Sequence, residues 1–117
     1  MSHVVYVEFN VPDAAKTAKF FEEAFGWEPT PLFEGYLSVQ HGDEPGIDTG
    51  IQQADGPATT VATLSVPDLD AAVRQVEEHG GTIVMPRFPI PGAGYAAYFR
   101  EPSGLTVGMW EADTSAK

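Results

Sequence analysis

The chain has 117 residues, of which 43% are hydrophobic, enough for one compact domain with a core and too few for two independent domains. No apolar run approaches the ~20 residues of a membrane-spanning helix. The first residues lack the basic and apolar segments of a secretory signal, so we expect a cytoplasmic protein. The absence of cysteine excludes disulfides, thiolate metal ligands and cysteine nucleophiles.

Seventeen acidic and six basic residues give a formal charge of −11. A polyanion would be repelled by this charge unless it met a concentrated basic patch, and the basic residues are scattered along the sequence. We therefore expect neither nucleic acid nor a membrane surface as a partner. The acidity favours cationic ligands, and it also fits a protein whose charge serves solubility or adaptation to salt.

The sequence repeats itself at an offset of 55 residues. Val11-Pro12-Asp13 recurs as Val66-Pro67-Asp68, and Glu22-Glu23 recurs as Glu77-Glu78 in the same register. Several matches in one order predict a duplicated module, with Asp55-Gly56-Pro57 as the joint. We expect one module over residues 1–56 and a second over residues 57–117.

The first module reads as a strand, a helix and further strands. Residues 4–11 alternate, which predicts a dry face with Val5, Val7, Phe9 and Val11 and a polar face with Tyr6, Glu8 and Asn10. Asp13 is placed to cap a helix that extends to Phe25, and Gly26 supplies its left-handed stop. Later strands are expected over residues 35–40 and 47–53.

The second module follows the same plan. A strand over residues 61–66 leads to Asp68, which caps a helix that extends to His79 and stops at Gly80-Gly81. Strands are expected over residues 82–85, 95–100 and 105–110. Each module is therefore predicted to be βαβββ, and the fold class to be α+β.

Together these motifs resemble the vicinal oxygen chelate superfamily of glyoxalases, bleomycin-resistance proteins and extradiol dioxygenases. The resemblance rests on Val-Pro-Asp after each first strand, on Phe21 to Trp27 at the end of the first helix, and on Glu101-Pro102-Ser103-Gly104-Leu105. It implies that the strands of two modules form an open, curled mixed sheet around a cleft, with the helices outside.

The resemblance also implies four cleft-facing positions from which metal enzymes of this superfamily take their ligands. In this sequence they correspond to Tyr6, Gly50, Val61 and Gly108. A divalent metal needs three or four converging donors, and these side chains do not provide them. We therefore expect no metal and no cofactor. A displaced metal site that uses Glu8 with His41 is the less favoured alternative.

Aromatic side chains point to a binding site for a small molecule. Candidate ligand-binding residues are Tyr6, Glu8, Gln52, Phe88, Tyr98 and Trp110. Gly50 and Gly108 are expected to leave space in the cleft, and the proline-rich residues 86–92 are expected to form a rim or lid, with Arg87 in a rim salt bridge or on a substrate carboxylate. The helical residues Phe20, Phe21 and Phe25 are expected in the core or in an interface.

The function predicted from these features is metal-free binding of a flat or amphipathic organic molecule, cationic or neutral rather than anionic, in an aromatic cleft with Glu8 as the polar anchor. The alternative is a metal-independent lyase or isomerase in which Glu8 is the catalytic base and Tyr6 or Tyr98 the proton donor. Open sheet edges predict a homodimer.

Overall fold

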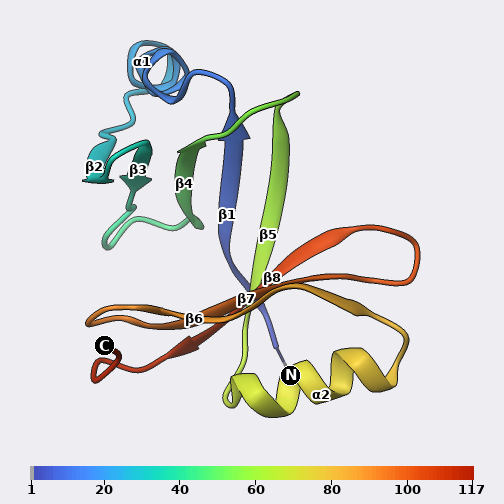
Figure 1. Cartoon of the computed structure of the whole chain (residues 1–117). Coiled ribbons are helices and arrows are strands. Elements are labelled where there is room, and N and C mark those ends of the chain that lie inside the picture. Colours follow the sequence, from blue (N-terminus) through green and yellow to red (C-terminus); the bar gives the residue numbers. More distant parts are fainter. Residues whose placement is uncertain (1) are drawn as a thin grey trace. The chain divides into compact units, whose positions relative to one another are not determined.

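The computed structural model describes residues 2–117 and divides into two compact units (Figure 1). The first unit spans Val5–Val61, and the second comprises Ala62–Lys117 with the N-terminal segment that ends at Val4. Each unit is built around one helix and a mixed sheet, so the predicted α+β class and βαβββ order are confirmed. Within the described residues, neither helix has the length and apolar character that crossing a bilayer requires.

The first unit contains one helix and a sheet in the strand order β2-β3-β4-β1. Strand β1 is parallel to β4, whereas β3 is antiparallel to both β4 and β2. Strand β2 was absent from the sequence prediction, because its four exposed residues include Pro31 and show no hydrophobic alternation. The elements are β1 (Val4–Val11), α1 (Ala14–Phe25), β2 (Thr30–Phe33), β3 (Tyr36–Val39) and β4 (Asp48–Gln53).

Helix α1 begins and ends where the sequence predicts. The Asp13 side chain accepts a hydrogen bond from the Lys16 N–H at 3.0 Å, and Gly26 ends the helix at φ 75°, a conformation that favours glycine. The face of α1 that carries Ala14 and Ala18 covers the sheet. Its core is completed by Val11, Val39 and Ile51, with Phe9, Trp27 and Leu37 packed against them.

Two of the three helical phenylalanines are not core residues. Phe21 stacks on Trp27 with ring centroids 4.4 Å apart, but Phe20 is 59% exposed and Phe25 is 68% exposed. Phe20 lies six residues after Ala14, on another side of a helix with 3.6 residues per turn, and Phe25 is the last helical residue. Phe20 and Phe25 are therefore not core residues, and an interface is the part of the prediction that stays open for them.

The second unit repeats this arrangement with the strand order β5-β8-β7-β6. Strand β5 is parallel to β8, and the other neighbours are antiparallel. The Asp68 side chain accepts a hydrogen bond from the Ala71 N–H at 3.1 Å, and His79 follows the last helical residue. The elements are β5 (Thr59–Ser65), α2 (Leu69–Glu78), β6 (Thr82–Ile90), β7 (Gly94–Arg100) and β8 (Thr106–Ala112).

Strand β6 corrects the prediction of a proline-rich lid. Residues 86–90 continue the strand that was expected to end at Met85, and Pro89 lies opposite Tyr95 of β7. Proline lacks the N–H of a ladder and is tolerated on edge strands and at bulges. Strand β6 is at the edge of the sheet and has two register shifts before Phe88. Arg87 forms an ion pair with Asp70 of α2 at 3.0 Å.

A side chain at the end of one strand contacts the start of the helix in each unit. Gln53 Oε1 accepts a hydrogen bond from the Ala14 N–H at 2.8 Å, and Glu111 Oε1 accepts one from the Leu69 N–H at 2.7 Å. These N–H groups have no partner within their helices. We call these two contacts the helix latches. They were not predicted, although the similar segments 51–54 and 109–112, each ending in alanine, carry the signal.

Candidate functional site

The sheet of the first unit has one face that α1 leaves uncovered. Because side chains alternate along a strand, Phe9 and Ile51 face α1 whereas Glu8 and Gly50 face the other way. Glu8 lies opposite Gly50, which lies opposite Ser38 of β3. Tyr6, Tyr36 and Gln52 belong to the same uncovered face. The structure thus places Tyr6, Glu8 and Gln52 on one face of one sheet.

Two tyrosines and a glutamate form a hydrogen-bonded chain on this face. The Tyr36 hydroxyl donates to Glu8 Oε2 at 3.2 Å, and the Tyr6 and Tyr36 hydroxyls are hydrogen-bonded to each other. Glu8 is 7% exposed and Tyr36 is 8% exposed. We call these three residues the phenol–carboxylate chain. The predicted polar face of β1 thus carries a buried side chain, Glu8, whereas Val5 of the predicted dry face is exposed.

Gly50 provides the space that this chain fills. A Cβ atom at position 50 would overlap the hydroxyl oxygens of both Tyr6 and Tyr36. The expectation that Gly50 leaves open space is therefore wrong, because the phenol groups of Tyr6 and Tyr36 occupy the volume that a side chain at position 50 would take. Tyr36 was not among the predicted ligand-binding residues, since nothing local in the sequence shows that a residue of β3 reaches across β4 to β1.

The environment keeps both phenols protonated. Burial raises the pKa of Tyr6, the charges of Glu8 and Asp48 raise it further, and the hydrogen bond to Tyr36 partly opposes them. Burial also raises the pKa of Tyr36, with added contributions from its hydrogen bond to Tyr6 and from the charge of Glu8. Near neutral pH both side chains are therefore neutral hydrogen-bonding groups rather than phenolates.

The surroundings of the phenol–carboxylate chain are acidic and aromatic. Asp48 lies opposite Tyr6 in the parallel pair of β1 and β4, and its Oδ1 accepts a hydrogen bond from the His41 N–H at 3.0 Å. The Phe33 ring lies 4.9 Å from the Tyr36 ring and is 59% exposed. A polar anchor and an apolar ring are thus present within the first unit alone.

The remaining predicted residues lie on the uncovered face of the second sheet, opposite the core that packs on α2. Phe88 and Tyr98 are stacked, with centroids 6.1 Å apart and an interplanar angle of 20°. Trp110 lies opposite Ala96, and its indole crosses Gly94, where a Cβ would come within 2.7 Å of the ring. Gly94 therefore allows the indole to lie close against β7.

The space over Gly108 is also occupied. A Cβ at this position would lie 2.6 Å from Thr63 Oγ1 and 3.3 Å from the Tyr98 ring. The expectation of open space is therefore wrong for Gly108 as it is for Gly50. In both sheets, a neighbouring side chain has taken the volume that the glycine leaves.

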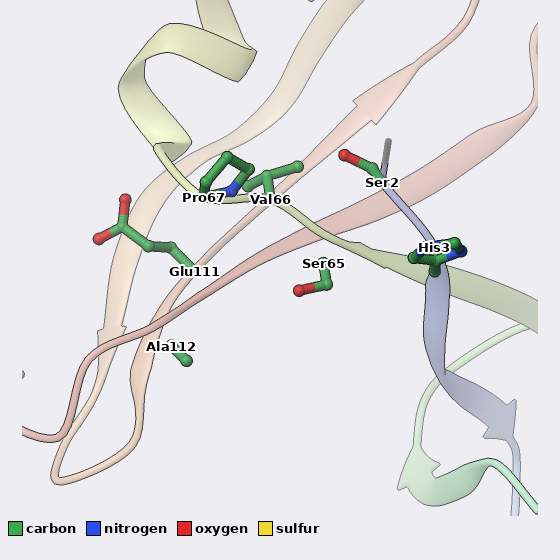
Figure 2. A pocket seen from close by; sticks show the side chains of 7 residues that line it. All are labelled: Ser2, His3, Ser65, Val66, Pro67, Glu111 and Ala112. Carbon is green, nitrogen blue, oxygen red and sulfur yellow. The ribbon is translucent and has the colours of Figure 1, made fainter.

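Two open hollows are lined by other residues. One, of about 640 Å³, lies in the second unit and is shown in Figure 2. A smaller one, of about 300 Å³, lies in the first unit beside Phe9 and Phe21. Neither contains a residue of the phenol–carboxylate chain. The larger hollow is lined by Ser2, His3, Ser65, Val66, Pro67, Glu111 and Ala112.

The repeated βαβββ units agree with a family assignment made from sequence. A family model described as the Glyoxalase/Bleomycin resistance protein/Dioxygenase superfamily matches residues 2–109. This chain belongs to that superfamily. The resemblance noted in the sequence is thereby confirmed.

Among members with curated names, the chain is similar to CFP32 of Mycobacterium tuberculosis, with 30% identity over 122 residues. It is also 27% identical over 124 residues to the anthracycline biosynthesis protein DauV of Streptomyces sp. strain C5. The alignments cover 92% and 90% of this chain but 45% of each relative. The chain thus spans less than half the length of these superfamily members.

Solved structures of the superfamily share the fold. The Mn(II)-bound glyoxalase from Novosphingobium aromaticivorans gives a TM-score of 0.72 at 24% identity, over 99% of this chain and 41% of that one. Homoprotocatechuate 2,3-dioxygenase from Brevibacterium fuscum gives 0.74 at 20% identity, over 97% of this chain and 37% of that one. At these identities the likeness concerns the fold alone.

The residues at the superfamily's metal-ligand positions do not fit a divalent metal. Of the four positions only Tyr6 carries a side-chain donor atom, and its hydroxyl is hydrogen-bonded to Tyr36, so three or four converging ligands are not available there. Val61 and Gly108 have no donor atom in their side chains. Among residues 2–117, no three His, Asp or Glu side chains are grouped so that they could hold a metal ion.

Proposed function

We propose that this chain is a metal-free member of the superfamily that binds a small organic molecule on the uncovered face of a sheet. The observation that carries the proposal is the phenol–carboxylate chain at Gly50. Phenol and carboxylate oxygens occupy a position from which metal enzymes of the superfamily take a ligand. They supply a polar anchor for an organic molecule in place of donors for a metal.

The buried carboxylate supports a role in binding. Burial of a charged group is costly unless hydrogen bonds compensate for the loss of water, and Tyr36 provides such a bond to Glu8. Small-molecule sites combine apolar walls with a few well-placed polar groups. Glu8, through Tyr36 and Tyr6, has the character of such a group.

The aromatic side chains of the second sheet support the same role. Phe88 and Tyr98 present a stacked pair, and the Trp110 indole lies close over Gly94. Aromatic rings favour offset stacking or edge contacts with other planar groups. A flat or amphipathic ligand is therefore the class that this surface suits best.

Catalysis is the second candidate function, and the direction of the hydrogen bonds favours it. Tyr36 donates to Glu8, so Glu8 can take the Tyr36 proton while Tyr36 takes that of Tyr6 and Tyr6 takes one from a substrate carbon, three concerted transfers that leave both phenols neutral. Glu8 then holds the proton and can return it to the product by the same route. Such a relay would serve a metal-independent isomerase or lyase, with Glu8 as the terminal base.

Tryptophan fluorescence tests the binding proposal, because the two tryptophans lie in different surroundings. Trp27 is packed on Phe21 and Phe9 in the core, whereas Trp110 lies on the uncovered face. In Trp27→Phe, where Trp110 is the only reporter, we expect saturable quenching by at least one of 1-naphthylmethylammonium, 1-naphthalenemethanol and 1-naphthoate. In Trp110→Phe, where Trp27 reports, we expect weaker quenching. No saturable quenching by any compound would contradict binding.

Proton exchange tests the catalytic candidate. A relay that ends at Glu8 predicts exchange of deuterium from D₂O into the carbon beside the carbonyl of 4-phenyl-2-butanone, followed by proton NMR. The exchange should disappear in Glu8→Gln, provided that its circular dichroism matches that of the unsubstituted chain. Exchange at the rate of buffer alone would leave binding as the function.

A further inference from the structure

The hydrogen-bond direction in the phenol–carboxylate chain determines what its outer end can recognise. Each phenol has one proton to donate and lone pairs to accept. Tyr36 donates its proton to Glu8 Oε2 at 3.2 Å, so the proton between the two phenols must come from Tyr6. The Tyr6 oxygen is then left with an acceptor capacity and no proton for a ligand.

Tyr6 is the member of the chain that a ligand can reach. Glu8 and Tyr36 are buried, whereas Tyr6 is half-buried. A ligand on the uncovered face therefore meets the Tyr6 phenol before it meets the carboxylate. Glu8 acts on the ligand indirectly. It accepts the proton of Tyr36, and Tyr36 in turn accepts the proton of Tyr6, so the Tyr6 proton points away from the ligand.

Negative charge surrounds this acceptor without a basic side chain on the same face. Asp48 is the direct strand partner of Tyr6, and it lies near enough for its charge to act on the phenol. The only lysines of the first unit, Lys16 and Lys19, belong to α1, which covers the opposite face, and this unit has no arginine. A cation at Tyr6 would therefore be attracted by both Asp48 and Glu8.

We propose that the outer end of the phenol–carboxylate chain binds the N–H of an organic ammonium group, with Tyr6 Oη as the acceptor and Asp48 as the counter-charge. This inference rests on the proposed binding function and names its ligand class. The body of the ligand would be aromatic or aliphatic, because the exposed Phe33 ring lies beside Tyr36. An N–H donor is required, so a quaternary ammonium fits less well than a primary one.

Four probes of similar shape separate these requirements in calorimetric or ligand-observed NMR titrations of the full chain. Benzylammonium carries both charge and N–H donors, benzyltrimethylammonium carries charge alone, benzyl alcohol is neutral, and benzoate is an anion. We expect benzylammonium to bind at least tenfold more tightly than benzoate and severalfold more tightly than the other two. Binding of these probes without preference for benzylammonium would overturn the inference and leave the proposed function standing.

Substitutions test whether the phenol–carboxylate chain causes the preference for benzylammonium. Glu8→Gln removes the charge and introduces an amide that can either accept from Tyr36 or donate to it, so the Tyr6 proton is no longer held toward Tyr36 and becomes available to a ligand. We expect it to lower the affinity for benzylammonium about tenfold and to raise that for benzoate. Tyr36→Phe, which disconnects Tyr6 from Glu8, should reduce the preference for benzylammonium over benzyl alcohol without reversing it.

A matched control removes a phenol hydroxyl elsewhere. Tyr95→Phe alters a residue under the Arg87 guanidinium in the second unit, and it should leave all four affinities unchanged. Equal losses in Tyr95→Phe and Tyr36→Phe would overturn the role of the chain, because they would indicate a general loss of structure. If none of the four probes binds and the naphthalene compounds also fail, the proposed function and this inference fall together. Binding of the naphthalene compounds alone would reject the inference only.

Discussion

Gln53 and Glu111 hold equivalent places in the two units, and each uses a side-chain oxygen to accept the first backbone N–H of its helix, at 2.8 Å and 2.7 Å. Gln53 is neutral and Glu111 is acidic, but both accept the hydrogen bond with the Oε1 atom. Each joins the strand beside the first strand of its unit to the helix that covers the sheet. The repeat thus preserves a contact as well as an order of elements.

Removal of a helix latch should destabilise the fold. A side chain that satisfies a free N–H at a helix start contributes about 1 kcal/mol, so we expect Gln53→Ala and Glu111→Ala each to lower the free energy of unfolding by about 0.5–2 kcal/mol in urea. Glu111→Gln keeps the Oε1 acceptor and should lose less. A loss in Glu111→Gln equal to that in Glu111→Ala would indicate that the charge matters rather than the bond.

Gly50→Ala should be destabilising because its Cβ would overlap the Tyr6 and Tyr36 hydroxyls. Overpacking of this kind costs about 1–3 kcal/mol, which thermal and chemical unfolding would measure. In a Tyr6→Phe/Tyr36→Phe background the closest atoms are gone, so the same substitution should cost less. An equal cost in both backgrounds would show that the hydroxyls do not occupy the space over Gly50.

The buried phenols predict a loss of stability at alkaline pH. The pKa of Tyr6 and that of Tyr36 are raised above 10.0 in the folded chain, so the folded state holds these protons more tightly than the unfolded state. Their contribution is complete below pH ~10 and is lost as the pH rises above that value. Urea unfolding between pH 8 and 11 should show this fall, and Tyr36→Phe should reduce its slope.

We expect the purified chain to contain no stoichiometric divalent metal. Of Tyr6, Gly50, Val61 and Gly108, only Tyr6 has a side-chain donor atom. Elemental analysis by plasma mass spectrometry after dialysis against a metal-free buffer checks this expectation. About one manganese, iron, nickel or zinc per chain would reject the metal-free proposal, and the Glu8→Gln variant would then show whether Glu8 is a ligand.

We propose that the chain is a homodimer. The exposed Phe20 and Phe25 rings of α1 provide apolar surface of a kind that association commonly covers. Sedimentation equilibrium at micromolar concentration should give twice the chain mass of 12.6 kDa. A mass of one chain would contradict the proposal, and Phe20→Ser/Phe25→Ser tests whether these two rings are the contact.

The helices were predictable from the sequence because their signals are local. Asp13 and Asp68 each cap a helix within three residues of the N–H that they accept, and Gly26 adopts the left-handed conformation that its position predicts. Strand β6 was cut short in the prediction because two prolines argue against a strand unless its edge position is known.

The candidate site was harder to predict because it depends on register between distant strands. Glu8 was identified from strand alternation, but its partner Tyr36 is 28 residues away on a strand that is not adjacent to β1. The prediction for Gly50 was also the opposite of what the structure shows. In the sequence, the missing side chain of a glycine indicates open space, whereas in the fold the hydroxyls of Tyr6 and Tyr36, from the two strands beside β4, fill that space. Only the spatial arrangement reveals which side chains converge there.

The helix latch at Gln53 and the glycine that makes room for the phenol–carboxylate chain both lie on strand β4, on opposite faces of it. Gln53 and Ile51 secure the helix side, whereas Gly50 and Gln52 belong to the other side. Because neighbouring positions serve different tasks, one set can change while the other keeps the fold intact. The architecture is thus suited to acquiring new ligands during evolution, and a directed-evolution library limited to alternate positions of β1, β3 and β4, with Gly50 retained, would explore recognition at little expense in foldability.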